Sequence, residues 1–115
     1  MNNLEDSYKA KGLRRQLIKE IKGKGIKSTT VLSAIGKMPR HVFFDSIFLE
    51  HAYEDKAFPI GEKQTISQPY TVAFQTELLN VSKGDKILEI GTGSGYQAAI
   101  LLELGAEVFT IEYNQ

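Results

Sequence analysis

The sequence predicts an α/β fold in which a helical N-terminal region precedes a β-α-β unit. A short apolar run within residues 86–90 is typical of a buried strand, and a turn at 91–95 that holds three glycines follows it. An apolar helical pattern covers 96–104, and a second apolar run follows at 108–111. A strand, a glycine turn and a helix form the opening unit of nucleotide-binding α/β folds. Glycines there permit positive φ and a close ligand approach, and the next helix N-terminus suits an anionic group.

Two helices are predicted before residue 40. The first covers 8–22 and ends at two glycines, and its Lys and Arg residues are expected on the solvent face. Its expected buried face consists of Leu13, Leu17, Ile18 and Ile21. Ser28 is a suitable N-cap for the second helix, and Pro39 stops that helix near Met38. Its expected buried stripe is Val31, Leu32 and Ile35.

An aromatic cluster is expected between residues 39 and 53, where Phe43, Phe44, Phe48 and Tyr53 favour a core over a ligand site. His41 and His51 are the only histidines and neither has a second His four residues on, so we expect structural or surface roles and no metal site.

Two short strands and a helix are predicted between 57 and 80. The strands are expected at 57–60, where Pro59 marks an edge, and at 65–67. Pro69 is a good first residue for a helix that reaches Leu79 or Asn80. Its expected buried stripe is Pro69, Val72, Ala73, Thr76 and Leu79.

The composition excludes several classes of function. Fourteen basic and fourteen acidic residues cancel, so no basic field attracts nucleic acid or an anionic membrane. Cysteine is absent, which excludes disulfide bonds and thiolate metal sites. No apolar run approaches the length of a membrane span. We expect one domain over the 115 residues, no nucleic-acid or membrane partner, and a cytoplasmic location.

The glycine spacing separates two ligand classes. A dinucleotide fingerprint is G-x-G-x-x-G, but here the third glycine, Gly95, comes one place early. Glu89 lies two residues before Gly91, and this E-x-G-x-G-x-G pattern resembles motif I of S-adenosylmethionine-dependent methyltransferases. Glu112 lies 21 residues after Gly91, where an acid commonly binds ribose hydroxyls. The alternative is a plain strand-to-helix turn, although such a turn needs one glycine and not three.

Further stretches narrow the resemblance. The segments PRHVFF, HAYED, PIG and QTISQPY precede ILEIGTGSGYQAA in this order. From about Arg14 to Glu112 the chain is similar to the protein-L-isoaspartate O-methyltransferases, and QTISQPY is the most discriminating part. The family's chains are longer, so this sequence resembles the N-terminal part of a Rossmann-like methyltransferase fold. In these terms 1–56 is a helical region, 57–85 holds the substrate strip and a connecting helix, and 86–115 is the cofactor-binding unit.

The resemblance implies methyl transfer from S-adenosylmethionine to the carboxylate of L-isoaspartyl residues in damaged proteins. It implies that Ser67 is the active-site serine, although Ser67 could instead help to start the helix at Pro69. The strip that lines the substrate pocket would be Thr65, Ile66 and Ser67. The cofactor loop would be Glu89, Gly91, Thr92, Gly93, Ser94 and Gly95, with Glu112 on the ribose.

Two other readings stay open. The same β-α-β signals occur in NAD- or FAD-linked oxidoreductases, against which the early Gly95 and the strand acid Glu89 count. A non-catalytic cofactor-binding or assembly module is the second. A strand at 87–90 without a second neighbour would expose an apolar edge, so we expect the chain by itself to form a homodimer. The family's longer chains hold the rest of the cofactor pocket and much of the acceptor site, so the resemblance also implies that this chain by itself has little activity.

Overall fold

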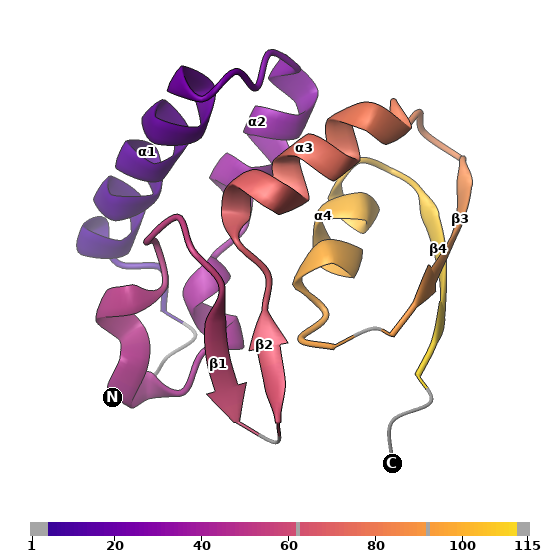
Figure 1. The fold of residues 1–115 in the computed structure, drawn as a ribbon. Coiled ribbons are helices and arrows are strands. Elements are labelled where there is room, and N and C mark those ends of the chain that lie inside the picture. The colour runs from indigo at the N-terminus through magenta and orange to yellow at the C-terminus, as the bar shows by residue number, and fades with distance from the viewer. Residues whose placement is uncertain (1–4, 62, 92, 113–115) are drawn as a thin grey trace.

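Ten helices and strands are described in the computed structural model, which covers residues 5–61, 63–91 and 93–112. They follow the predicted order, with two short 3₁₀ helices added in the aromatic region (Figure 1). The elements are α1 (Tyr8–Gly23), α2 (Thr29–Lys37), η1 (Arg40–Phe43), η2 (Ser46–His51), β1 (Phe58–Gly61), β2 (Gln64–Ile66), α3 (Pro69–Leu79), β3 (Lys86–Ile90), α4 (Tyr96–Glu103) and β4 (Glu107–Ile111).

The strands form two separate ladders. β3 and β4 pair in parallel, from Lys86 opposite Glu107 to Ile90 opposite Ile111, and α4 connects them. The predicted β-α-β unit is therefore confirmed. β1 and β2 form an antiparallel hairpin whose register shifts between Pro59 and Gly61. Figure 1 shows α4 between the β3–β4 pair and the other three helices, so that the glycine turn before α4 faces the β1–β2 hairpin.

The first two helices begin where their caps predict. The Ser7 hydroxyl accepts from the Ala10 N–H at 3.1 Å, and the Ser28 hydroxyl accepts from the Val31 N–H at 3.3 Å. Each hydroxyl satisfies one of the backbone donors that a helix start leaves without an intrahelical partner. α2 ends at Lys37, two residues before Pro39, as predicted.

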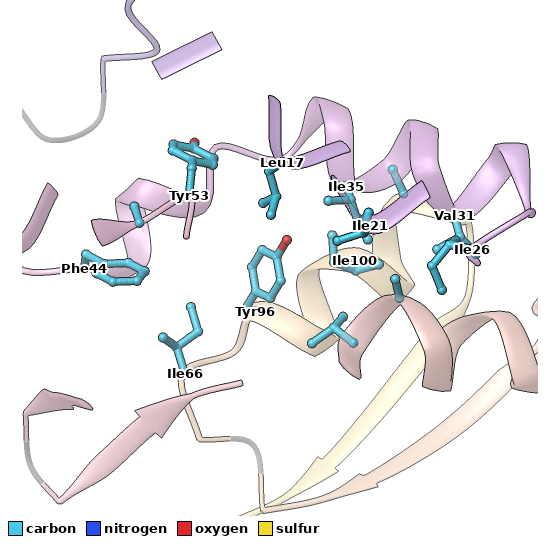
Figure 2. Packing of buried hydrophobic residues seen from close by; sticks show 14 of the residues in the cluster. Leu17, Ile21, Ile26, Val31, Ile35, Phe44, Tyr53, Ile66, Tyr96 and Ile100 are labelled. Atoms are coloured by element: carbon cyan, nitrogen blue, oxygen red, sulfur yellow. The ribbon is translucent and has the colours of Figure 1, made fainter. Parts of the chain in front are cut away.

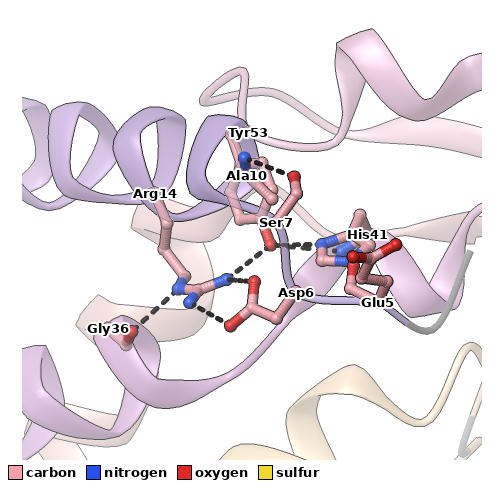
Figure 3. A network of polar contacts seen from close by, with 8 residues as sticks. All are labelled: Glu5, Asp6, Ser7, Ala10, Arg14, Gly36, His41 and Tyr53. Carbon is pink, nitrogen blue, oxygen red and sulfur yellow. Dashed lines mark hydrogen bonds and ion pairs between the residues drawn. The ribbon is translucent and has the colours of Figure 1, made fainter.

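The buried face of α1 differs from the predicted one. Ala10, Arg14, Leu17 and Ile21 are buried, whereas Leu13 is 37% exposed. Arg14 was expected on the solvent face and is instead 5% exposed. Its guanidinium is buried because Asp6 forms an ion pair with it and Tyr53 and the Gly36 carbonyl accept from it, as Figure 3 shows.

The core lies where α1, α2, α3 and α4 meet above the β1–β2 hairpin. Figure 2 shows Leu17, Ile21 and Ile35 facing Tyr96 and Ile100 of α4, with Ile66 of β2 below them. The aromatic cluster belongs to this core, since Phe44 and Tyr53 are buried and Phe43 and Phe48 pack against it.

Two predicted burial patterns are wrong in part. Leu79 is 55% exposed, because α3 ends there and Asn80 adopts a left-handed conformation. On β3, Leu88 and Ile90 are 58% and 64% exposed, whereas Ile87 and Glu89 are half-buried. The strand is covered on one face only, so the prediction of a buried strand holds for one of its two faces.

No helix among the described residues has the length and apolar character needed to cross a membrane.

Candidate functional site

A pocket of about 110 Å³ joins the β2–α3 segment to the glycine turn. It lies at the carboxyl end of β3, where ligands bind in open α/β sheets. The lining residues are Thr65, Ser67, Val72, Glu89, Gly91, Gly93, Ser94, Tyr96 and Gln97. Predicted residues of the substrate strip and of the cofactor loop therefore meet in one pocket, although 22 positions separate Ser67 from Glu89 in the sequence.

The backbone of the turn explains its glycines. Gly91, Gly93 and Gly95 have φ values of +75°, +58° and +87°, which residues with a Cβ rarely adopt. The Gly91 N–H donates to the Ile111 carbonyl at 2.7 Å and so extends the β3–β4 ladder into the turn. The Ser94 hydroxyl accepts from the Tyr96 N–H at 3.1 Å at the start of α4. Gly91, Gly93 and Ser94 of this turn line the pocket.

Glu89 presents the most unusual polar atom of the pocket. Its Oε1 is buried and has no hydrogen-bond partner among the described residues. Burial raises the pKa of the Glu89 carboxyl above its usual value of 4.5. A buried carboxylate oxygen without a donor is unfavourable. Its place in the pocket fits a ligand that brings an N–H or a positive charge.

Glu112 lies beside the loop and outside the pocket lining. Its Oε2 accepts from the Gly93 N–H at 3.2 Å, and the residue is exposed. The carboxylate therefore lies next to the turn, as a ribose-binding acid would, and its role stays a prediction. Gly95 is also absent from the lining, and Thr92 lies outside the described residues.

The substrate strip has two faces. Thr65 and Ser67 line the pocket, whereas the side chain of Ile66 is completely buried in the core. Successive residues of a strand point to opposite faces, which explains the alternation. The structure therefore assigns the Ile66 side chain to packing, and the expectation that it lines the pocket does not hold for its side chain.

Ser67 does not cap α3. The N-cap position belongs to Gln68, which makes no side-chain cap bond, and the Asp55 carboxylate accepts from the Tyr70 N–H at 2.8 Å instead. Within the described part of the chain, the Ser67 hydroxyl has no hydrogen-bond partner, and Ser67 lines the pocket. The alternative role in starting the helix is therefore not observed.

Sequence reasoning missed three residues near the pocket. Arg40, 1% exposed, donates from Nη2 to the Ser67 carbonyl at 2.9 Å. Tyr96 lines the pocket with a buried ring, and burial raises the pKa of its hydroxyl to about 12. Gln97 donates to the Thr76 hydroxyl at 2.9 Å. Arg40 belongs to the PRHVFF segment, but no local pattern indicates that an Arg there reaches Ser67.

The histidines lie away from the pocket lining. His41 is buried, with Nδ1 at 2.8 Å from the Tyr53 hydroxyl and Nε2 at 2.8 Å from the Glu5 carbonyl. His51 is exposed and pairs with Glu54. In the described ranges no group of three or more His, Cys, Asp or Glu side chains could hold a metal ion.

Comparisons with known proteins agree on one family. The family model for protein-L-isoaspartate(D-aspartate) O-methyltransferase matches residues 12–115. A protein-L-isoaspartate O-methyltransferase of Cytophaga hutchinsonii is 66% identical over 97% of this chain and 51% of its own length. One of Christiangramia forsetii is 62% identical over 95% of this chain and 51% of its own length. The chain spans about half the length of these relatives.

Solved structures support the same fold. A protein-L-isoaspartate O-methyltransferase superposes with a TM-score of 0.79 at 32% identity, over 89% of this chain and 34% of its own. A Plasmodium falciparum protein in complex with S-adenosyl-L-homocysteine gives a TM-score of 0.72 at 23% identity, over 89% of this chain and 50% of its own. The second likeness shows the fold alone.

Proposed function

Because the chain belongs to the protein-L-isoaspartate O-methyltransferase family, we propose that the protein carrying it methylates L-isoaspartyl carboxylates in damaged proteins, with S-adenosylmethionine as donor. The observation that supports the proposal most is the pocket in which Thr65 and Ser67 face the glycine turn and Glu89. A methyl donor and a carboxylate acceptor must meet in one place from which water is excluded. The pocket of this chain offers a glycine loop for the donor and a hydroxyl for the acceptor.

The residues present fit the cofactor. The carboxylate of Glu89 has an acceptor oxygen free for the ammonium group of S-adenosylmethionine. The turn at 91–95, with Gly91, Gly93, Ser94 and Gly95 described and Thr92 outside the described residues, would hold its amino-acid end, and Glu112 would bind the ribose hydroxyls. When bound, the cofactor supplies an electrophilic methyl group. A dinucleotide would need a longer glycine spacing, which counts against an oxidoreductase.

The chain's own residues orient the acceptor. A carboxylate is a nucleophile at neutral pH, so the site needs no strong base. The Ser67 hydroxyl donates a hydrogen bond to one carboxylate oxygen and leaves the other oxygen to react. Thr65 of β2 lines the same pocket, and the neighbouring Ile66 anchors that strand in the core.

The substrate claim has a direct test. Full-length protein that contains this chain should label an isoaspartyl peptide with radioactive methyl from S-adenosylmethionine and leave the matched aspartyl peptide unlabelled. Equal labelling of the two peptides would overturn the assignment. Titration with S-adenosylhomocysteine and with NAD separates the methyltransferase from an oxidoreductase, and cofactor binding without turnover would indicate a non-catalytic module.

The role of Ser67 is tested by Ser67→Ala. Loss of one oriented hydrogen bond should lower kcat about ten- to a hundredfold and change the dissociation constant of S-adenosylhomocysteine far less. Ser33→Ala, on the exposed side of α2, is the control and should change neither value. An unchanged kcat in Ser67→Ala would show that Ser67 has a structural role only.

Two properties of the 115-residue chain by itself are also proposed. It is a poor enzyme, since a cleft that lacks one side neither orients its ligands nor excludes water. Turnover within about tenfold of the full-length protein would contradict this. It also forms a homodimer.

The cytoplasmic location and the lack of nucleic-acid and membrane partners stay predictions from the sequence.

A further inference from the structure

Arg40 is a buried cation behind the candidate site. It begins η1, and 1% of its surface is exposed. Its Nε donates to the Ala52 carbonyl at 2.8 Å, and its Nη2 donates to the Ser67 carbonyl at 2.9 Å. One guanidinium thus joins the turn after η2 to the strip that holds the candidate serine.

The same guanidinium contacts the cofactor side of the pocket. Its Cζ lies 4.7 Å from the centre of the Tyr96 ring and 5.6 Å from that of Phe44. Tyr96 follows Gly95 directly, is the first residue of α4 and lines the pocket. Cations over aromatic faces at such distances are attracted to the ring electrons. Arg40 therefore holds the Ser67 backbone by one hydrogen bond and the start of α4 by a cation–π contact with Tyr96.

No carboxylate of the described residues forms an ion pair with Arg40, and its Nη1 has no hydrogen-bond partner there. Burial lowers the pKa of the Arg40 guanidinium. An unpaired buried charge is unfavourable, so this residue is a poor choice for stability alone. A planar group with several directed donors is, however, suited to hold two carbonyls and a ring at fixed distances, which a Lys ammonium cannot do.

We propose that Arg40 is the positioning residue of the methyl-transfer site: it fixes the Ser67 segment relative to the glycine loop through Tyr96. The inference rests on the proposed function. A carboxylate held by Ser67 must meet the methyl donor in line, and a displacement of about 1 Å between such groups can lower the rate about a hundredfold. Arg40 sets that distance without touching either ligand.

The test uses Arg40→Lys in the full-length protein, with Arg14→Lys as matched control. Arg14 is also buried and donates from Nε to the Gly36 carbonyl at 2.8 Å, but it lies outside the pocket lining. Arg40→Lys should lower kcat for the isoaspartyl peptide about ten- to a hundredfold per folded molecule, with a smaller change in KM. Arg14→Lys should lower the melting temperature and leave kcat per folded molecule unchanged.

A double-mutant cycle separates positioning from a purely structural role. If Arg40 acts through Ser67, Arg40→Lys should cause less than about a threefold further loss in the Ser67→Ala background. Full additivity of the two losses, or the same kinetics for Arg40→Lys and Arg14→Lys, would overturn the proposal.

Hydrogen exchange of the ligand-free protein gives a readout that does not depend on turnover. Arg40→Lys should speed amide exchange at 65–68 and at the start of α4, and Arg14→Lys should not. If the wild type fails to methylate the isoaspartyl peptide while this pattern holds, the proposed function and the role of Arg40 in methyl transfer both fail. Only the structural part then stands, in which Arg40 holds residues 65–68 against the start of α4. Arg40→Gln is the second variant should Arg40→Lys not fold. Failure of both to fold would make Arg40 a folding residue and would overturn the inference.

Discussion

At the scale of single residues, Glu89 is the acid whose ionisation the fold disfavours. Burial raises the pKa of its carboxyl above 4.5. A carboxyl with a raised folded pKa binds its proton more tightly in the folded state, so stability falls as the pH rises from 4.5 through the folded pKa. Glu89→Gln should therefore raise the melting temperature of the ligand-free protein at neutral pH. Well below pH 4.5, where the carboxyl is protonated in both states, the substitution should leave the melting temperature unchanged.

The same substitution should weaken cofactor binding. Loss of a charge-assisted hydrogen bond to the ammonium group should raise the dissociation constant of S-adenosylhomocysteine roughly ten- to a hundredfold. Calorimetric titration measures the affinity, and melting curves across pH measure the stability. Glu107→Gln, an exposed acid on β4, is the control and should change neither. A pH dependence of Glu89→Gln identical to that of the wild type would contradict the argument.

The Tyr53 hydroxyl is the centre of a second buried group of polar residues (Figure 3). It lies 2.8 Å from both Arg14 Nη1 and His41 Nδ1. Tyr53→Phe removes this partner from two buried groups and should lower the free energy of unfolding by about 1–3 kcal/mol, as measured in urea. Tyr8→Phe is the control, because Tyr8 is 94% exposed. Equal effects of the two substitutions would show that the Tyr53 hydroxyl contributes nothing.

At the scale of elements, the start of α3 depends on a residue outside the helix. Asp55 has a side chain only 1% exposed; it accepts from the Tyr70 N–H and forms an ion pair with Lys24 of the α1 C-cap. Asp55→Ala should therefore lower the free energy of unfolding by about 0.5–2 kcal/mol and speed amide exchange in the first turn of α3.

The matched control for this element is Asp45→Ala. Asp45 caps η2 by accepting from the Ile47 N–H at 3.2 Å, but at an exposed position. Asp45→Ala should lower the free energy of unfolding by less than Asp55→Ala does, and it should leave amide exchange in α3 unchanged. A loss of stability in Asp55→Ala without faster exchange at 69–71 would show that Asp55 acts only through Lys24.

Elements with local signals were predictable. The Ser28 cap, Pro39, Pro69 and the glycines at 91, 93 and 95 each act within a few residues, so the sequence places α2, α3 and the turn within a residue or two. The buried face of α1 was not predictable in full. An Arg is expected in solvent unless its partners are known, and Tyr53 lies 39 residues from Arg14.

The residues of the candidate site also fall into two groups, those that local motifs predict and those that only contacts between distant positions place. Ser67, Glu89 and the glycine turn are visible in motifs, and the structure places them around one pocket. The orientation of Ile66 depends on where β2 begins, since a shift of one residue moves each side chain to the other face. Arg40 could not be assigned, because its contact with Ser67 spans 27 positions and no local pattern encodes it.

At the scale of the whole molecule, one face of the β3–β4 ladder is apolar and uncovered. Leu88 pairs with Phe109 and Ile90 with Ile111, so the four side chains share a face. Their exposed fractions are 58%, 52%, 64% and 50%, respectively. In the described sheet each of these strands has one partner and therefore one free edge. Exposed apolar faces and free edges promote association, and a net charge of zero opposes it little.

The chain of 115 residues by itself should therefore be a homodimer at roughly tens of micromolar, as light scattering after size-exclusion chromatography will show. Phe109→Ser should shift it towards the monomer, because it removes the largest side chain of the shared face. Ile47→Ser is the control, since Ile47 is 76% exposed on η2, away from the ladder. A monomeric wild type whose β3 amides are protected from exchange would contradict this argument, because the edge would then be stable without a second copy.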